Sequence, residues 1–286
     1  MMIPCDPKLL TDLCNQDRIS GTGSLGGFGY DLDLSVPFVT TAIHAGHRVR
    51  SELAPLMAIS EKDRLAEEDT ATDRIIRACP SRIWGLDSRA EYDLNRPPEL
   101  ALPVTPEMFW DIRVYESSPT DAMNRRSLEK YAAFYRFAAT VVKVLLDRFG
   151  ACIFYDIHSY NIQRQVDKGH REPPVFNLGT LGIDRAKWEK PVAAWLDHLG
   201  QIKIPDRLTT VAENGVFGGM GEFCRRLTQW DPNILVLPTE VSKIYMDERR
   251  GVVHNSKIHA LRNGLAMAIR AHGQLFQSLN RSGNCG

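Results

Sequence analysis

Three short apolar runs, each followed by a histidine or a glutamate, constrain the fold of this 286-residue chain more than any other feature. The runs are residues 38–43, 151–157 and 233–238, and the polar residues that follow them are His44, His158 and, after Thr239, Glu240. Runs of this length, rich in β-branched and aromatic residues, are typical of buried strands. Polar side chains that follow such strands often form sites in open α/β sheets.

Segments with helical spacing of apolar residues separate these runs. Residues 127–149 are strongly helical in pattern and stop at Gly150, a residue favoured at helix C-termini. Further helices are expected over residues 187–200 and from about 254 to 279. The Gly/Ser-rich stretch at residues 20–29 is expected to be a loop before the first core strand.

Strands that alternate with helices indicate an α/β fold. We therefore expect a single domain over residues 1–286, with its motif-bearing core at about 35–280. The sheet should be mixed and mainly parallel, with helices on both faces. His44, His158 and Glu240 should then meet at one edge of that sheet.

Charge and cysteine usage exclude several classes of protein. The chain has 35 basic and 35 acidic side chains, so no overall field favours nucleic acid or an anionic membrane. No run approaches the roughly 18 apolar residues of a membrane span, and no signal peptide is recognisable. The six cysteines form no C-x-x-C pair, so reduced thiols are expected rather than disulfides or a cysteine zinc site. These features favour a cytoplasmic protein with a small-molecule substrate.

Histidines at strand ends point to a metal. Imidazoles and carboxylates are the usual ligands of a catalytic zinc ion, and three protein ligands leave one position for water. His44 and His158 are therefore predicted to bind one zinc ion. The third ligand is expected in residues 67–73, a cluster of four carboxylates that is also typical of a helix N-terminus. The candidates are Glu68 first, Asp69 as the alternate, and His47 through an H-x-x-H pair with His44.

Two further acids have predicted roles beside the metal. Asp156 lies two residues before His158, so in a strand it points the same way and can hold that imidazole. Glu240 is the candidate for a general base that takes a proton from a metal-activated water and passes it to the leaving nitrogen.

A polar segment at residues 88–97 is a candidate substrate clamp. It is expected to be strand-like, and it carries Arg89, Asn95 and Arg96. Guanidinium groups bind carboxylates bidentately, which favours an acidic substrate. The alternative is a solvated surface strand with internal ion pairs. The glycine-rich residues 214–221 lack a phosphate-loop pattern and are a weaker candidate for closing over a ligand.

Together these motifs resemble the N-formylglutamate amidohydrolase family over about residues 35–250. The motifs are His44-Ala-Gly, Glu67-Glu68-Asp69, Ser88-Arg89 with Asp93-Leu94-Asn95-Arg96-Pro97, Asp156-Ile-His158-Ser159, Phe217-Gly218-Gly219 and Glu240 with Tyr245-Met246-Asp247-Glu248. Two departures stand out. The family more often has Pro-His-Ser-Gly where this chain has Ile43-His44-Ala45-Gly46, and His47 stands where the similar zinc carboxypeptidases have glutamate.

The resemblance implies one Zn²⁺ per chain, held by His44, an acid near Glu68, and His158. It implies that Glu240 is the base and proton shuttle. The implied substrate contacts are Arg89, Asn95, Arg96, Gly218, Gly219 and Tyr245, with Arg96 also polarising the scissile carbonyl.

The implied reaction is hydrolysis of the amide bond of a small N-acyl acidic amino acid. The best match is N-formyl-L-glutamate, cleaved to formate and glutamate as in histidine degradation. A shared zinc site does not fix the acyl group. Two alternatives therefore stay open: a related zinc peptidase or amidase acting on a peptide or a cell-wall acyl-amino acid, and a zinc- or ligand-binding protein without turnover.

Overall fold

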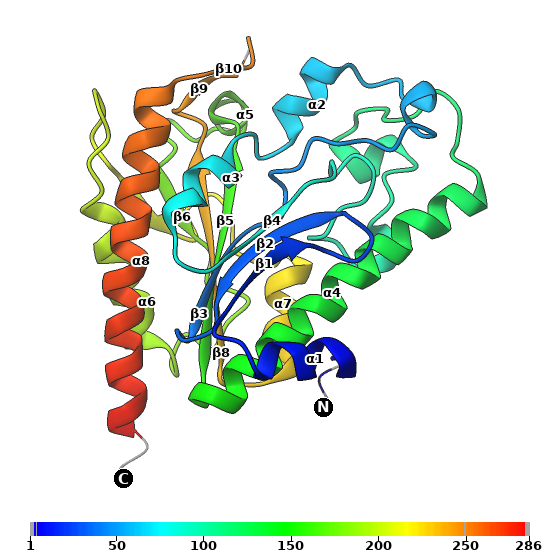
Figure 1. Ribbon diagram of the computed structural model, residues 1–286. Coiled ribbons are helices and arrows are strands. Elements are labelled where there is room, and N and C mark those ends of the chain that lie inside the picture. The colour runs from blue at the N-terminus through cyan, green and yellow to red at the C-terminus, as the bar shows by residue number, and fades with distance from the viewer. Residues whose placement is uncertain (1–2, 4, 249, 284–286) are drawn as a thin grey trace.

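One eight-stranded sheet organises the computed structural model, which describes residue 3, residues 5–248 and residues 250–283 (Figure 1). The strand order is β1-β2-β4-β3-β5-β8-β6-β7. The strands are β1 (Arg18–Thr22), β2 (Phe28–Asp33), β3 (Phe38–Ala42), β4 (Arg82–Gly85), β5 (Cys152–Tyr160), β6 (Phe176–Leu178), β7 (Val211–Glu213) and β8 (Ile234–Ser242). The four central strands, β4, β3, β5 and β8, pair in parallel, and antiparallel pairs flank them. The prediction of a mixed, mainly parallel sheet is confirmed.

Helices cover both faces of this sheet (Figure 1). One face carries α3 (Thr72–Ile75), α6 (Glu189–Gly200) and α8 (Asn255–Gly283). The opposite face carries α1 (Pro7–Cys14), α4 (Asp121–Phe149) and α7 (Glu222–Trp230). Two short helices, α2 (Glu61–Glu67) and α5 (Ile162–Asp167), lie near the carboxyl ends of the central strands, and β9 (Met246–Asp247) pairs with β10 (Val252–Val253) beside them.

The central strands β5 and β8 begin with apolar runs because both faces of the sheet are covered. In β5, Tyr155 packs in the cluster that contains Trp195 of α6. The preceding residue, Phe154, lies on the opposite face of the sheet and packs in the cluster that contains Phe134 of α4. A strand buried on both sides carries no alternation of polar residues, which is why these runs are recognisable in the sequence.

The expected helices are present, with one earlier start. Helix α4 begins at Asp121 rather than Ser127, because the Thr120 hydroxyl accepts a hydrogen bond from the Met123 N–H and caps the helix. It ends at Gly150, whose φ of 75° is the left-handed conformation that glycine adopts without strain.

The expected loop at residues 20–29 is confirmed only at residues 23–27, because residues 20–22 and 28–29 belong to the hairpin of β1 and β2. Glycine in these strands makes room for aromatic rings. A Cβ atom on Gly29 would lie 2.5 Å from the ring of Trp84, and one on Gly21 would lie 2.8 Å from the Tyr30 hydroxyl. Glycines in a strand therefore mark a close approach here and not a break.

The strand expected at residues 88–97 is also absent, and this segment forms successive turns. The Ser88 hydroxyl accepts a hydrogen bond from the Ala90 N–H at 3.1 Å, and the Asp93 carboxylate accepts one from the Asn95 N–H at 2.8 Å. Short polar side chains that satisfy nearby backbone groups in this way favour turns over strands.

No helix among the described residues has the length and apolar character that a membrane span requires. Five cysteines of this part of the chain are free thiols, and Cys285 lies outside it. The cytoplasmic location and the domain bounds of 1–286 stay predictions.

Candidate active site

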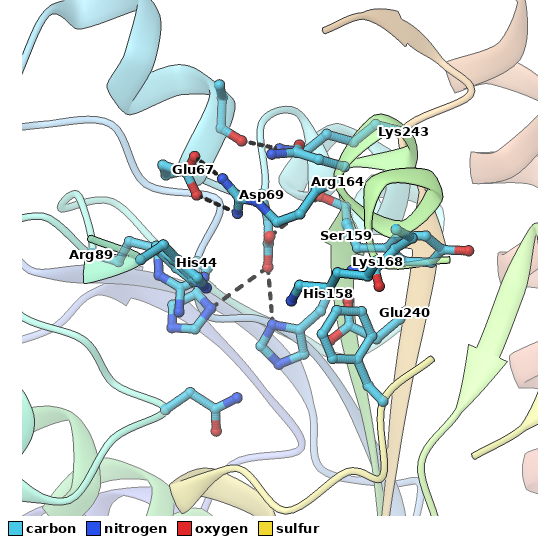
Figure 2. A pocket seen from close by; sticks show the side chains of 17 residues that line it. His44, Glu67, Asp69, Arg89, His158, Ser159, Arg164, Lys168, Glu240 and Lys243 are labelled. Carbon is cyan, nitrogen blue, oxygen red and sulfur yellow. Dashed lines mark hydrogen bonds and ion pairs between the residues drawn. The ribbon is translucent and has the colours of Figure 1, made fainter. Parts of the chain in front are cut away.

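The three polar residues that follow the apolar runs meet at the carboxyl edge of the central strands (Figure 2). In the register of β5 and β8, His158 lies directly beside Glu240. His44 follows β3, which is the other neighbour of β5, and its ring centroid is 5.0 Å from that of His158. Parallel pairing of β3, β5 and β8 therefore brings together residues that are far apart in sequence.

A buried group with the composition of a metal site forms at this edge. His44, Asp69 and His158 each offer one ligand atom, and these atoms all lie within 4.8 Å of one another. The Asp69 carboxylate is 2.9 Å from His158 Nδ1 and 3.6 Å from His44 Nδ1. Within the described part of the chain, His44 Nδ1 is buried and has no hydrogen-bond partner. An orphaned imidazole nitrogen that faces a carboxylate and a second imidazole fits the donor set of zinc.

A carboxylate contacts the Nε2 atom of each imidazole. His44 Nε2 lies 2.8 Å from Asp93, and His158 Nε2 lies 2.9 Å from Asp156. When each Nε2–H donates to its carboxylate, the lone pair of each Nδ1 points into the group, as metal binding requires. The position of Asp156 agrees with its predicted role. Asp156 is itself fixed, because the Thr41 hydroxyl donates to its other oxygen at 2.6 Å.

Charge complementarity inside the group is strong. Burial lowers the pKa of His158, but Asp156 and Asp69 outweigh burial and raise that pKa well above its ordinary value. Burial raises the pKa of Asp69, but the two facing histidines outweigh burial and hold that pKa far below its ordinary value. The Asp69 carboxylate is therefore ionised and available as an anionic ligand.

The structure brings Asp69, and not Glu68, into the group. The Glu68 carboxylate accepts hydrogen bonds from Arg64 at 2.9 Å and from the Ser88 hydroxyl, and it contacts the half-exposed His47. Glu68 has extended backbone angles, so successive side chains point to opposite sides. The first choice for the acidic ligand thus lies outside the group, the alternate lies inside it, and His47 is occupied by Glu68 and Glu61.

The segment that carries Asp69 links two helices, since α2 ends at Glu67 and α3 begins at Thr72. A helix N-terminus also lies in the cluster at residues 67–73, because Asp73 is in the first turn of α3, but the N-cap residue is Ala71 and not Asp69 or Thr70. Lys243 holds the linking segment in place: the buried ammonium group donates to the carbonyl oxygens of Ala66 at 2.6 Å and Glu68 at 2.9 Å. Burial lowers the pKa of Lys243. This contact of Lys243 was not predicted from the sequence.

Glu240 is half-buried and reaches the space beside the group (Figure 2). Burial is the main cause that raises its pKa to about 7, with His158 opposing the shift and Asp69 adding to it. A carboxyl group that titrates near neutral pH can both accept and release a proton under physiological conditions, as a general base or acid must.

Two cavities meet at this site. The first, of about 200 Å³, is lined by His44, Asp69, His158 and Glu240, and it also contains the cations Arg89, Arg164, Lys168 and Lys243. The second, of about 260 Å³, shares Asn95, His158, Phe217 and Glu240 with the first and continues along the glycine-rich loop at residues 218–221.

The predicted clamp lies partly at the first cavity. Arg89 lines it, binds Asp93 at 2.7 Å and lies 4.5 Å from the centroid of the Trp110 ring. Asn95 lines both cavities, and its side-chain oxygen accepts a hydrogen bond from the Phe223 N–H. Arg96 lines neither of them; its guanidinium lies 3.5 Å from the Asp93 carboxylate.

Of the remaining predicted substrate contacts, two line a cavity and one does not. Gly218 and Gly219 line the second cavity, where the loop packs against Gly179 so closely that a Cβ there would lie 2.3 Å from the Gly219 nitrogen. Tyr245 lines neither cavity, because it is buried and its hydroxyl donates to the Thr70 carbonyl at 3.0 Å.

Three residues at the first cavity were missed from the sequence. Arg164 in α5 binds Glu67 through both nitrogens of its guanidinium fork, and Lys168 follows that helix by one residue. The ring of Trp110 lies 5.6 Å from the Arg164 guanidinium. The signal was the four-residue spacing of the two cations directly after the strand that carries His158, which places them on one side of a helix.

The fold and the site together define an α/β protein with a histidine–carboxylate group and a glutamate at the carboxyl edge of its sheet, a combination typical of metal-dependent hydrolases. The chain belongs to the N-formylglutamate amidohydrolase family, whose family model matches residues 36–246. The resemblance drawn from the motifs is thereby confirmed, and membership supports hydrolase activity on an amide.

Two solved structures share this fold. The N-formylglutamate amidohydrolase of Ralstonia eutropha JMP134 matches with a TM-score of 0.68 at 20% identity, over 90% of this chain and 99% of that chain. A gene product of Agrobacterium tumefaciens matches with a TM-score of 0.62 at 17% identity, over 93% and 97%. A metallo-carboxypeptidase of Burkholderia cenocepacia is more distant, with a TM-score of 0.37 at 14% identity, over 94% and 68%. No curated protein matches the chain in sequence.

Proposed function

We propose that this protein is a zinc-dependent amidohydrolase that cleaves the amide bond of an N-acyl acidic amino acid, with N-formyl-L-glutamate as the best substrate. The observation that carries the proposal is the buried group of His44, Asp69 and His158, whose imidazoles turn Nδ1 inward beside Glu240. A zinc ion in this group would supply Lewis acidity to the amide carbonyl and to water.

Glu240 moves the proton in this proposal. Its carboxylate accepts a proton from the attacking water and delivers it to the amide nitrogen as the C–N bond breaks and the C–O bond forms. The pKa of about 7 supports this role, since a weaker base would not accept the proton and a stronger one would not release it. The products are a carboxylic acid and a free amino acid.

The cations of the first cavity bind the carboxylates of the substrate. Arg89 and Arg164 are held by Asp93 and Glu67, so their positions are fixed before substrate arrives. Lys168 and Lys243 add two further positive charges to the same cavity. Arg96 lies with Arg89 beside the Trp110 ring. We propose that Arg96 also contacts a substrate carboxylate and polarises the scissile carbonyl.

The test loads the protein with zinc and measures formate released from N-formyl-L-glutamate. Glu240→Gln is expected to lower the rate by about 10²–10⁴, the range of proton-transfer catalysis. Glu213→Gln is the matched control, because Glu213 pairs with Arg185 away from both cavities and should leave the rate unchanged. Equal activity of the parent and Glu240→Gln would refute the assigned base.

Two other outcomes of this test would support the alternative functions. Hydrolysis of a longer acyl-peptide without release of formate would identify a zinc peptidase or amidase. Stoichiometric zinc binding without hydrolysis of any N-acyl amino acid in a panel would identify a ligand-binding protein.

A further inference from the structure

The second cavity is larger than a formyl group needs. Its volume of about 260 Å³ equals that of about nine water molecules at roughly 30 Å³ each in the liquid. A formyl group has two heavy atoms and replaces about two such waters. The size of this cavity therefore points to a larger group at the acyl end of the substrate.

The charges of the two cavities orient the substrate. Four cations line the first, Arg89, Arg164, Lys168 and Lys243, whereas no lysine or arginine of the described residues lines the second. The carboxylates of an acidic amino acid are therefore attracted to the first cavity. His158 and Glu240 line both, so the scissile amide lies where the cavities meet and the acyl group extends into the second.

Four glycines line the second cavity: Gly179, Gly218, Gly219 and Gly221. Cys224 of α7 lines it too, together with the larger side chains of Phe217, Met220 and Pro238. The Cys224 side chain is buried, and burial raises the pKa of its thiol, so it is an unreactive group whose contribution is its volume. A change at this position alters the space available without touching the reacting atoms.

We propose that the second cavity is an acyl chamber that admits short unbranched acyl groups larger than formyl, from acetyl to butyryl, and that Cys224 limits their length. This inference rests on the proposed amidohydrolase function. The reaction stays a hydrolysis: water adds its oxygen to the acyl carbon, the C–N bond breaks, and a short carboxylic acid and the amino acid leave. An oxidant, a reductant or a second substrate is not needed.

The test compares kcat/KM for N-formyl-, N-acetyl-, N-propionyl- and N-butyryl-L-glutamate in the zinc-loaded parent, Cys224→Ala and Cys224→Val. The parent is expected to cleave the acetyl to butyryl compounds within about tenfold of the formyl compound. Cys224→Val should lower the butyryl value by about 10–200-fold, the discrimination that one methylene produces, with the formyl value nearly unchanged. Cys224→Ala should raise the butyryl value relative to formyl.

The matched controls are Cys152→Ala and Cys152→Val. Cys152 is an equally buried cysteine in β5 that lines neither cavity, so its variants should move all four values together. Profiles that are alike in the Cys224 and Cys152 variants would overturn the role of Cys224. A parent that cleaves the formyl compound and discriminates against acetyl by more than about a thousandfold would overturn the acyl chamber and leave the proposed function intact.

Absence of turnover for all four compounds would refute the proposed function instead. Calorimetric binding of the same series to the zinc-loaded parent then decides on the chamber. Affinity that increases with acyl length in the parent, and does so less in Cys224→Val, supports it. Affinity independent of acyl length overturns it.

Discussion

Replacing Asp156 with asparagine is expected to weaken zinc binding about 10–100-fold, the usual effect of losing a carboxylate behind a metal-binding histidine. The substitution is close to isosteric. The amide oxygen can still accept from His158 Nε2, now 2.9 Å from one carboxylate oxygen, and the amide NH2 can donate to the Thr41 hydroxyl, now 2.6 Å from the other. What disappears is the negative charge that makes the imidazole a better donor. At about 1.4 kcal/mol per factor of ten, the expected loss is about 1.4–2.7 kcal/mol of binding free energy.

The corresponding substitution beside His44, Asp93→Asn, should lower the free energy of unfolding more than Asp156→Asn does. Asp93 is 2.8 Å from His44 Nε2 and also binds the buried Arg89 at 2.7 Å. Asp93→Asn therefore weakens the metal site and also leaves a guanidinium group without its charge partner. Unfolding in urea should show a loss of stability for Asp93→Asn that exceeds the loss for Asp156→Asn.

Zinc affinity is measured by competition with a chromophoric chelator at fixed pH. Asp147→Asn is the control, because Asp147 lies on the exposed side of α4 and pairs with Lys143. Unchanged zinc affinity in both Asp156→Asn and Asp93→Asn would refute the inference that these carboxylates turn the two imidazoles toward one ion. An equal loss in Asp147→Asn would show that the effect is not specific to the site.

Three further predictions concern the acidic ligand, the substrate cations and a histidine of the core. Asp69→Asn is expected to abolish tight zinc binding, whereas Glu68→Gln should retain it, and calorimetric titration with zinc separates these outcomes; the reverse pattern would restore Glu68 as the ligand. Arg164→Gln is expected to raise KM for N-formyl-L-glutamate with little change in kcat, because it binds ground state and transition state alike, whereas Arg96→Gln should lower kcat. Burial lowers the pKa of His272 from 6.5 to about 4, so between these values the unfolded chain binds a proton that the folded chain does not. The free energy of unfolding should therefore fall by about 2 kcal/mol from pH 7 to pH 5 through this residue alone, and His272→Gln should remove that part of the pH dependence in urea unfolding. An identical pH dependence in parent and variant would contradict the assignment.

The edge of the sheet was predictable because strand ends are visible in sequence. His44, His158 and Glu240 each follow a run that is apolar on both faces, and parallel pairing then brings their side chains together. The pairing of Asp156 with His158 follows from the two-residue repeat of a strand, which holds wherever the backbone is extended.

The choice between Glu68 and Asp69 was not predictable in the same way. Neighbouring residues in an extended link point to opposite sides. A prediction that is wrong by one position therefore selects Glu68, a partner of Arg64, in place of Asp69, the candidate ligand. The cation Arg164 was missed because its helix, α5, has only 6 residues, too few to establish a periodic pattern. The hairpin at residues 20–29 was missed because its glycines lie under aromatic rings that only the folded sheet supplies.

The contact of Lys243 with the carbonyl groups before Asp69 makes metal binding at the proposed site depend on complete folding. His44, Asp69 and His158 all precede residue 160, yet the backbone that presents Asp69 is fastened by an ammonium group that follows β8. A fragment that ends before β8 would contain every ligand and still lack the support that aims one of them. High-affinity zinc binding should therefore require β8 and the residue that follows it, and not only the part of the chain that carries the three proposed ligands.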